Sequence, residues 1–362
     1  MPSMLSACAR TIGLGLAGAA VLSVAAFADS DHHHKARQLD RVFVIMMENH
    51  GFDEVIGQAD PSDPTGATLL TPFTTHIALN YGLATYYFGA THPSLPNYLA
   101  DVAGDYFGIQ SDADSCFAPD HGTTCIAGLT APNIVDQLEQ KHISWEVLQE
   151  TMPSIGYLGT RYPTAASGGP KLYAQKHNPF VYFTSVATNP ARLQNIKPFD
   201  LTAFQTELND PQHMARYVFI APNQCNDEHG YTGGSPIPAG CAPADGDAAL
   251  LKRGDTFLQQ TVTAIQNSPS FTDDSAIFVV WDENDFSGNL GCCGAPGVGG
   301  GHIASIVITK HGKPKKSALP MNHYSMLATI EDGFGLPRLA NAKTANAMWD
   351  LFPEREDVGF GH

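Results

Sequence analysis

The sequence predicts an α/β fold with a mostly parallel central sheet, flanked by helices and joined by long loops. Three observations lead to this expectation: short apolar runs with the length of buried strands, helix-like segments between them, and extended stretches rich in Gly, Pro, Ser and Asp. Strands that alternate with helices are typical of a parallel sheet covered on both faces.

Four apolar runs predict buried strands because they are short, rich in Val, Ile and Phe, and bounded by polar residues. They cover residues 41–47, 216–221, 276–281 and 303–309, and weaker candidates cover 143–148 and 180–186. If the strong runs lie side by side, they form the centre of the sheet.

Three segments between these runs predict helices. Residues 131–141 follow Thr130 as a possible N-cap and carry Pro132 in the first turn, where proline is tolerated. Residues 247–267 keep their apolar side chains roughly on one face. The third segment, 324–334, ends before Gly335, as helices often do.

The N-terminus has the pattern of a cleaved secretory signal peptide over residues 1–28. Arg10 precedes an apolar run, and Ala26-Phe27-Ala28 forms an A-x-A cleavage site after Ala28. We therefore expect a protein that is secreted or periplasmic. No later segment reaches the roughly eighteen apolar residues of a membrane span, so stable membrane insertion is not expected.

Residues 29–362 are expected to form a single domain, because no linker divides them clearly. The stretches rich in Gly, Pro, Ser and Asp then become long surface loops, which are often functional. They cover residues 57–72, 111–128, 159–170, 230–246 and 284–301.

The charge balance is acidic, with 36 Asp and Glu against 20 Lys and Arg and a formal net charge of −16. A nucleic-acid partner is not expected, since phosphate backbones require a basic surface.

Cysteine spacing favours disulfides in an exported protein. Cys8 is lost with the signal peptide, and the remaining cysteines fall into three local couples. The expected pairs are Cys116 with Cys125, Cys225 with Cys241, and a strained vicinal pair of Cys292 with Cys293.

Two predicted strands end in pairs of oxygen-bearing side chains. Glu48 and Asn49 follow the first strand, and Asp282 and Glu283 follow the strand at 276–281. Parallel strands end at one edge of a sheet, where ligands bind, and oxygen donors suit Ca²⁺, Mg²⁺ or Mn²⁺. Each pair alone is also compatible with an ordinary turn, a helix cap or a solvated acidic loop.

Ser94 lies between two prolines in Thr91-His-Pro-Ser-Leu-Pro-Asn-Tyr-Leu-Ala100, just where a helix is expected to begin. A hydroxyl at a helix N-terminus beside a cation can act as a nucleophile on phosphorus. The alternative is a simple helix cap. His177 and His229 lie among polar neighbours and could supply a proton or stabilise phosphate charge, with His302 and His323 as weaker candidates.

Together these segments resemble the bacterial and fungal phosphoesterase family that contains secreted acid phosphatases and non-specific phospholipases C. The resemblance rests on ordered motifs: Met47-Glu-Asn49, Thr91 to Ala100, Tyr173-Ala-Gln-Lys-His-Asn-Pro-Phe180, Asn226-Asp-Glu-His229, Trp281-Asp-Glu283, and His323-Tyr-Ser-Met-Leu-Ala-Thr-Ile-Glu331 with Gly335-Leu-Pro337.

The resemblance implies an alkaline-phosphatase-like fold and assigns a role to each matching residue. Glu48, Asn49, Ser94, Asp282 and Glu283 match the ligands of a divalent metal ion, and Ser94 also matches the nucleophile. His177 and His229 match active-site histidines.

Two departures from the family pattern bear on the activity. His50-Gly51-Phe52-Asp53 stands where many members have Arg-Ser-Phe-Asp, and Asn284-Asp285 stands where many phospholipases have Asp-Gly. The second departure favours a phosphatase over a phospholipase.

The sequence as a whole predicts an exported, metal-dependent acid phosphatase that hydrolyses small-molecule or lipid phosphomonoesters through a phosphoserine. The acidic optimum is expected because histidine protonates near pH 6.5. Two alternatives remain at this stage: a phospholipase C that cleaves phosphodiesters, and a secreted metal- or anion-binding protein without turnover.

Overall fold

The computed structural model describes residues 37–230, 233–286, 291 and 299–354. The expected signal peptide lies outside the described residues, as does the expected Cys292–Cys293 pair. Everything below concerns the described part of the unit that begins at Lys35.

A nine-stranded sheet forms the centre of the fold, in the order β10-β2-β9-β8-β1-β7-β3-β6 with β11 also paired to β2. Its strands are β1 (Arg41–Met47), β2 (Gly82–Phe88), β3 (Trp145–Glu150), β6 (Ile196–Phe199), β7 (Tyr217–Ala221), β8 (Ser275–Trp281), β9 (His302–Thr309), β10 (Lys315–Ser317) and β11 (Met321–Asn322).

The sheet is mostly parallel, as predicted. β1 pairs in parallel with β7 and β8, and β3 pairs in parallel with β6 and β7. β9 runs antiparallel to both β8 and β2. Every residue of β1, β7 and β8 is buried, which explains their continuous apolar sequences.

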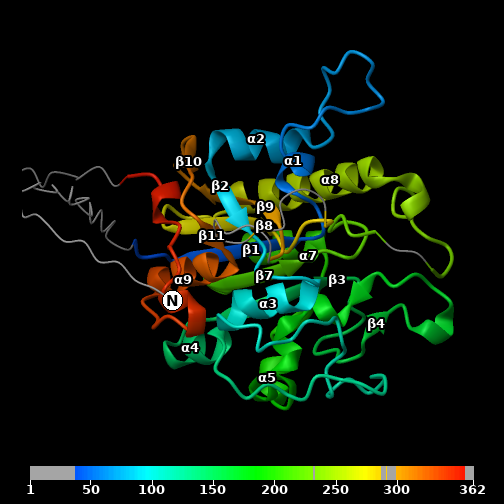
Figure 1. Cartoon of the computed structure of the whole chain (residues 1–362). Coiled ribbons are helices and arrows are strands. Elements are labelled where there is room, and N and C mark those ends of the chain that lie inside the picture. Colours follow the sequence, from blue (N-terminus) through cyan, green and yellow to red (C-terminus); the bar gives the residue numbers. More distant parts are fainter. Residues whose placement is uncertain (1–36, 231–232, 287–290, 292–298, 355–362) are drawn as a thin grey trace, which may run out of the picture. The chain divides into compact units, whose positions relative to one another are not determined.

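Helices cover both faces of this sheet (Figure 1). On one side α2 (Pro72–Asn80) packs against α8 (Asp247–Gln266), which also contacts α7 (Leu201–Leu208). On the other side α3 (Ser94–Ala103) packs against α9 (His323–Phe334). The remaining α-helices are α1 (Phe52–Val55), α4 (Ile134–Gln140), α5 (Thr184–Ala187) and α6 (Pro190–Leu193), and β4 (Arg161–Tyr162) with β5 (Tyr173–Ala174) forms a separate two-stranded sheet.

Residues 180–186 are not a strand, so that prediction was wrong. Pro179–Tyr182 form a 3₁₀ helix, and α5 follows directly. Pro179 lacks the N–H of a ladder hydrogen bond and has the φ angle of a helix start. The aromatic side chains that suggested a strand are buried nonetheless.

The predicted helix at 131–141 is shorter and begins at a different residue. Its N-cap is Asn133, whose side chain accepts a hydrogen bond from the Val135 N–H while Asp136 caps in return. Thr130 and Pro132 therefore lie before the helix, because Asn133 and Asp136 complete a capping box three residues later.

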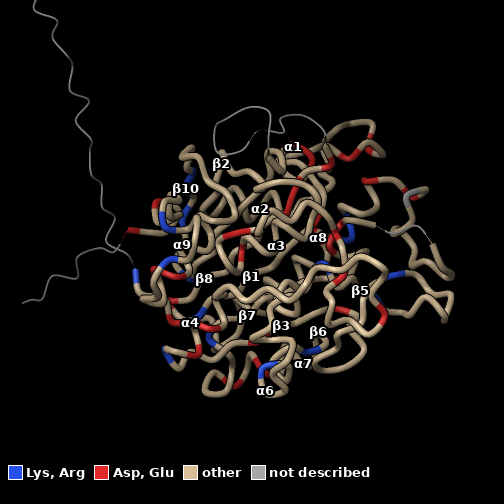
Figure 2. Tube along the Cα trace, turned by 60° about the horizontal axis from the view of Figure 1, so that its bottom comes forward, with Lys and Arg blue, Asp and Glu red and all other residues tan. Residues whose placement is uncertain are grey.

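Both expected disulfides within the described residues are present, Cys116–Cys125 and Cys225–Cys241. No helix among the described residues is long and apolar enough to cross a membrane. Acidic positions occur around the periphery of the trace and also in its middle, between the labels of β2, α2 and α3 (Figure 2). The interior acidic positions need a physical explanation, since buried carboxylates are costly.

One buried carboxyl group away from the strand ends gives the fold a pH dependence. Glu331 of α9 is fully buried, and its Oε1 accepts a hydrogen bond of 2.8 Å from the Leu339 N–H. Burial raises the pKa of Glu331 to about 8, from an ordinary value of 4.5.

In the variant Glu331→Gln, the free energy of unfolding should therefore fall less with rising pH than it does in the native protein. Between about pH 4.5 and pH 8 the folded protein holds a proton on Glu331 that the unfolded chain has released, so the free energy of unfolding falls as pH rises. Glutamine keeps the acceptor but does not titrate. Urea unfolding at pH 5 and pH 8 measures the difference, and an unchanged pH slope in the variant would contradict this assignment.

Candidate active site

The candidate site lies where β1 and β8 end together. Their register pairs Met47 with Trp281, so the residues after both strands emerge side by side. The Asp282 N–H donates to the Met47 carbonyl over 3.0 Å, and the Asn49 N–H donates to Asp282 Oδ1 over 3.1 Å. The expected neighbourhood of the two strands is confirmed.

Ser94, the first residue of α3, contacts one carboxylate from each strand end. Its Oγ is 3.0 Å from Glu48 Oε2 and 3.2 Å from Glu283 Oε1, and the residue is 1% exposed. The structure thus brings together strand ends that are far apart in sequence with the serine of the intervening helix.

The start of α3 is fixed by Asn97. Its side-chain oxygen accepts from the N–H groups of Ala90 and Thr91, and its amide donates to the Thr91 carbonyl over 2.7 Å. The prolines on either side of Ser94 limit the backbone further and are compatible with a first helical turn. Ser94 is therefore held rigidly.

His177 lies between two buried carboxylates. Its Nε2 is 3.1 Å from Glu48 Oε1, and its Nδ1 is 3.2 Å from Asp227 Oδ2. The ring also stacks on Tyr98 with centroids 5.2 Å apart. Burial lowers the pKa of His177 well below its ordinary value, and the Lys176 ammonium lowers it further.

His229 is also buried and also has a lowered pKa. Its Nδ1 is 2.8 Å from the Gly230 carbonyl, so Nδ1 must carry the proton and Nε2 presents its lone pair. Burial, followed by the Lys176 ammonium, lowers the pKa of His229 to about 4. The expectation that this histidine protonates near pH 6.5 is therefore wrong for the protein as it stands here.

Lys176 and Asp112 also belong to the site, although the sequence did not single them out. Lys176 Nζ is 2.9 Å from Ser94 Oγ and 3.2 Å from Asp112 Oδ2. Asp112 Oδ1 in turn accepts from the Leu95 N–H over 3.0 Å, which caps the first turn of α3. One signal in the sequence could have identified Lys176. It stands directly before His177 in the motif from Tyr173 to Phe180.

Two other histidines contact Asp282 and Glu283. His92 Nδ1 is 2.7 Å from Glu283 Oε2, and its ring stacks on Phe286. His323, one of the weaker candidates, contacts the Asp282 carbonyl with Nε2 at 2.7 Å and the buried Asp101 with Nδ1 at 3.1 Å. His302 is not at this point and lies between Phe52 and the Thr85 carbonyl.

The carboxylates repel one another and are costly to ionise. Burial raises the pKa of Glu48 to about 7, with the Lys176 ammonium opposing that rise. Burial also raises the pKa of Asp282 well above its ordinary value, and the charges of Glu48 and Glu283 add to that effect. Such a cluster favours cations.

The predicted ligand residues fit a divalent metal ion chemically. Asn49 Oδ1 and Asp282 Oδ2 are shielded from solvent and make no hydrogen bond in the described part of the chain. Buried oxygens without donors are what a hard cation would satisfy. Within that same part of the chain, His, Cys, Asp and Glu side chains alone form no group of three or more that could hold a metal.

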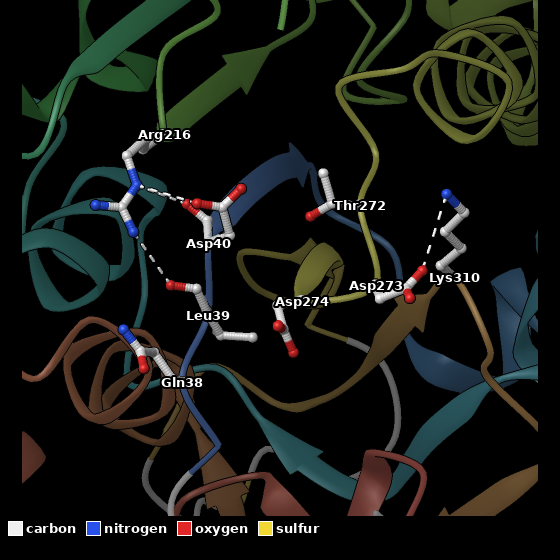
Figure 3. Close-up of a pocket in the computed structure, with 8 residues that line it drawn as sticks. All are labelled: Gln38, Leu39, Asp40, Arg216, Thr272, Asp273, Asp274 and Lys310. Carbon is white, nitrogen blue, oxygen red and sulfur yellow. Dashed lines mark hydrogen bonds and ion pairs between the residues drawn. The ribbon is translucent and has the colours of Figure 1, made fainter. Parts of the chain in front are cut away.

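A separate cavity lies at the amino ends of the central strands and lacks the buried carboxylates and the serine of the candidate site. It has a volume of about 540 Å³. Figure 3 shows Arg216 contacting Asp40 and the Leu39 carbonyl, and Lys310 reaching Asp273. Its charged side chains pair with each other near the amino ends of β1, β7 and β8, away from Ser94.

Solved structures share the fold of this chain. A protein of the alkaline phosphatase superfamily from Vibrio parahaemolyticus matches with a TM-score of 0.54 and 13% identity, over 87% of this chain and 72% of the other. The lipoteichoic acid synthase LtaP of Listeria monocytogenes matches with a TM-score of 0.51 and 10% identity, over 86% and 77%. The predicted alkaline-phosphatase-like α/β fold is confirmed.

The chain belongs to the phosphoesterase family, whose sequence model matches residues 67–337. It is 34% identical to a phosphate-repressible acid phosphatase of Penicillium chrysogenum, over 71% of this chain and 53% of the relative. It is 28% identical to a phosphatidylinositol-3-phosphatase of Mycobacterium tuberculosis, over 86% and 82%. A probable acid phosphatase of Kluyveromyces lactis is 29% identical, over 83% and 59%. The chain thus spans little more than half the length of these two fungal relatives.

Proposed function

We propose that the protein is an exported, metal-dependent acid phosphatase that hydrolyses phosphomonoesters through a phosphoserine at Ser94. The observation that carries this proposal is the position of Ser94 Oγ, 3.0 Å from Glu48 and 3.2 Å from Glu283 at the N-terminus of a ten-residue helix. The names of the relatives, acid phosphatases and a lipid monophosphatase, favour a monoester substrate.

Ser94 would attack the phosphorus in line with the leaving alkoxide. The backbone of the first turn of α3 and the Lys176 ammonium lie beside the serine and suit the negative charge of a phosphate. Water would then release phosphate from the serine. Asn97 holds the turn in place, so the nucleophile needs no reorganisation before it reacts.

Glu48, Asn49, Ser94, Asp282 and Glu283 would hold the divalent ion, whether Ca²⁺, Mg²⁺ or Mn²⁺. When bound, this ion supplies positive charge that favours ionisation of the serine hydroxyl and stabilises the phosphate oxygens. The buried oxygens without hydrogen bonds support this ligand set.

His229 would protonate the leaving oxygen once substrate is present. A phosphate group next to the ring brings negative charge, which raises the pKa of a histidine from the value of about 4 given by burial and Lys176. His229 would therefore gain its proton when the substrate binds. Low pH would favour this protonated form. His177, held between Glu48 and Asp227, would keep both carboxylates in position.

Export is proposed from the signal-peptide pattern of residues 1–28, with cleavage after Ala28 and one catalytic domain over residues 29–362. The two disulfides are consistent with this location.

Ser94→Ala should abolish turnover of p-nitrophenyl phosphate, because no other hydroxyl takes the place of the nucleophile. We expect a loss of at least about 10³-fold in kcat, by analogy with removal of other catalytic nucleophiles. The measurement is steady-state hydrolysis at pH 4 to 8, with the near-UV circular dichroism of the variant as the control for folding. Retained activity in the folded variant would exclude Ser94 as the nucleophile.

The same preparation should leave phosphatidylcholine intact. Faster cleavage of this diester than of the monoester would instead identify a phospholipase C, and absence of any phosphoester turnover despite metal binding would identify a binding protein.

Asp282→Asn should weaken metal binding sharply, because it removes one charge from the ligand set while keeping its shape. Calorimetric titration of chelator-treated protein with Mn²⁺ should show at least about a tenfold higher Kd, in the range seen for altered metal sites. Asp273→Asn, an exposed carboxylate at the other edge of the sheet, serves as the matched control. Equal Kd values for both variants and the native protein would remove Asp282 from the site.

A further inference from the structure

Lys176 makes a direct contact with the proposed nucleophile. Its Nζ lies 2.9 Å from Ser94 Oγ, and the residue is 7% exposed. We propose that Lys176 is a catalytic residue whose ammonium donates to Ser94 Oγ and stabilises negative charge there and on the transferring phosphoryl group. This inference rests on the proposed function and adds a fixed cation to it.

The direction of the hydrogen bonds follows from the chemistry of the ammonium. An ammonium has donors and no acceptor, so Ser94 Oγ must accept from Lys176. The serine's own hydrogen must then point to Glu48 Oε2 at 3.0 Å or Glu283 Oε1 at 3.2 Å. Lys176 therefore turns a lone pair of Ser94 toward itself and turns the serine proton toward a carboxylate.

The other contacts of Lys176 keep its ammonium in this position. Nζ is 3.2 Å from Asp112 Oδ2 and 3.4 Å from His229 Nε2, which presents a lone pair because Nδ1 binds the Gly230 carbonyl. Glu48 Oε2 lies 3.9 Å away. Each of the three ammonium hydrogens thus has an acceptor, and the group is oriented before substrate arrives.

Two carboxylates face the Lys176 ammonium. Asp112 Oδ2 lies 3.2 Å from Nζ, and Glu48 Oε2 lies 3.9 Å from it. A positive charge paired with carboxylates therefore contacts the serine oxygen that becomes negative in the reaction.

The balanced step is as follows. Ser94 Oγ loses its proton to water and forms a bond to phosphorus, while the ester P–O bond breaks with its electron pair on the leaving oxygen, which takes a proton from the protonated form of His229. Lys176 keeps all its hydrogens and moves its donors from the serine oxygen toward the phosphoryl oxygens as charge develops there.

The experiment compares Lys176→Met with Lys197→Met in p-nitrophenyl phosphate hydrolysis. Lys197 pairs with Glu146 at 2.7 Å, so its variant also removes a lysine–carboxylate pair, but far from Ser94. We expect kcat to fall by about 10²-fold or more in Lys176→Met, as for loss of other charge-stabilising donors, while Lys197→Met stays within about threefold of native.

Chemical rescue of Lys176→Ala is a second measurement. A lysine with only a structural role would not give a variant whose kcat is restored by a small ammonium ion. Added ethylammonium should restore part of the lost kcat in a saturable manner, because it returns a buried N–H donor with positive charge. Tetramethylammonium at the same ionic strength should not, since it has the charge but no donor. Equal rescue by both ions, or rescue by neither, contradicts the proposal.

Removal of Lys176 leaves Asp112 without its partner, which could prevent folding. The comparison is therefore repeated as Lys176→Met/Asp112→Asn against Asp112→Asn alone, in which the lysine change no longer leaves Asp112 without its partner. A kcat within about threefold of the matched background, in folded protein, overturns the role of Lys176. Failure of the proposed function is distinguished by Ser94→Ala: if that variant remains active, the reaction itself has been misassigned.

Discussion

The parallel pairing of β1 with β8 is the constraint on which the rest of the site depends. Because Met47 lies opposite Trp281, Glu48 with Asn49 and Asp282 with Glu283 leave the sheet at the same point. A slip of one residue would send every side chain of a strand to the other face. β1, β7 and β8 are buried along their whole length, so a slip would also require the close-packed core around them to repack.

The site in turn imposes a cost on the fold. Glu48, Asp282, Glu283 and Asp227 are all nearly inaccessible, and burial raises the pKa of several of them. Lys176 offsets part of this repulsion, and a bound divalent ion would offset more. Ser94 is held within this cluster, between the carboxylates of Glu48 and Glu283 and beside the Lys176 ammonium.

Much of this arrangement could be predicted from sequence because it depends on local patterns. The run at 41–47 predicted β1 with its observed bounds, and the oxygen-bearing pairs after β1 and β8 converge as expected. The strand predicted at 180–186 was wrong. Buried aromatic residues do not distinguish a strand from the 3₁₀ helix that begins at Pro179. β2 was missed since Gly82 and two tyrosines give it no continuous aliphatic run. Lys176 was missed because its importance comes from Ser94, which is distant in sequence. The low pKa of His229 results from burial and then from the Lys176 ammonium, neither of which is visible in the local sequence.

The most direct test of the central claim is to trap the covalent intermediate. Native protein is mixed with ³²P-labelled phosphomonoester, quenched in acid within the first turnover, digested, and analysed by mass spectrometry. The account predicts phosphate on the peptide that contains Ser94, bound as an acid-stable phosphoserine. Phosphate on a different serine or threonine, or turnover with no acid-stable phosphoenzyme at any time, would contradict it.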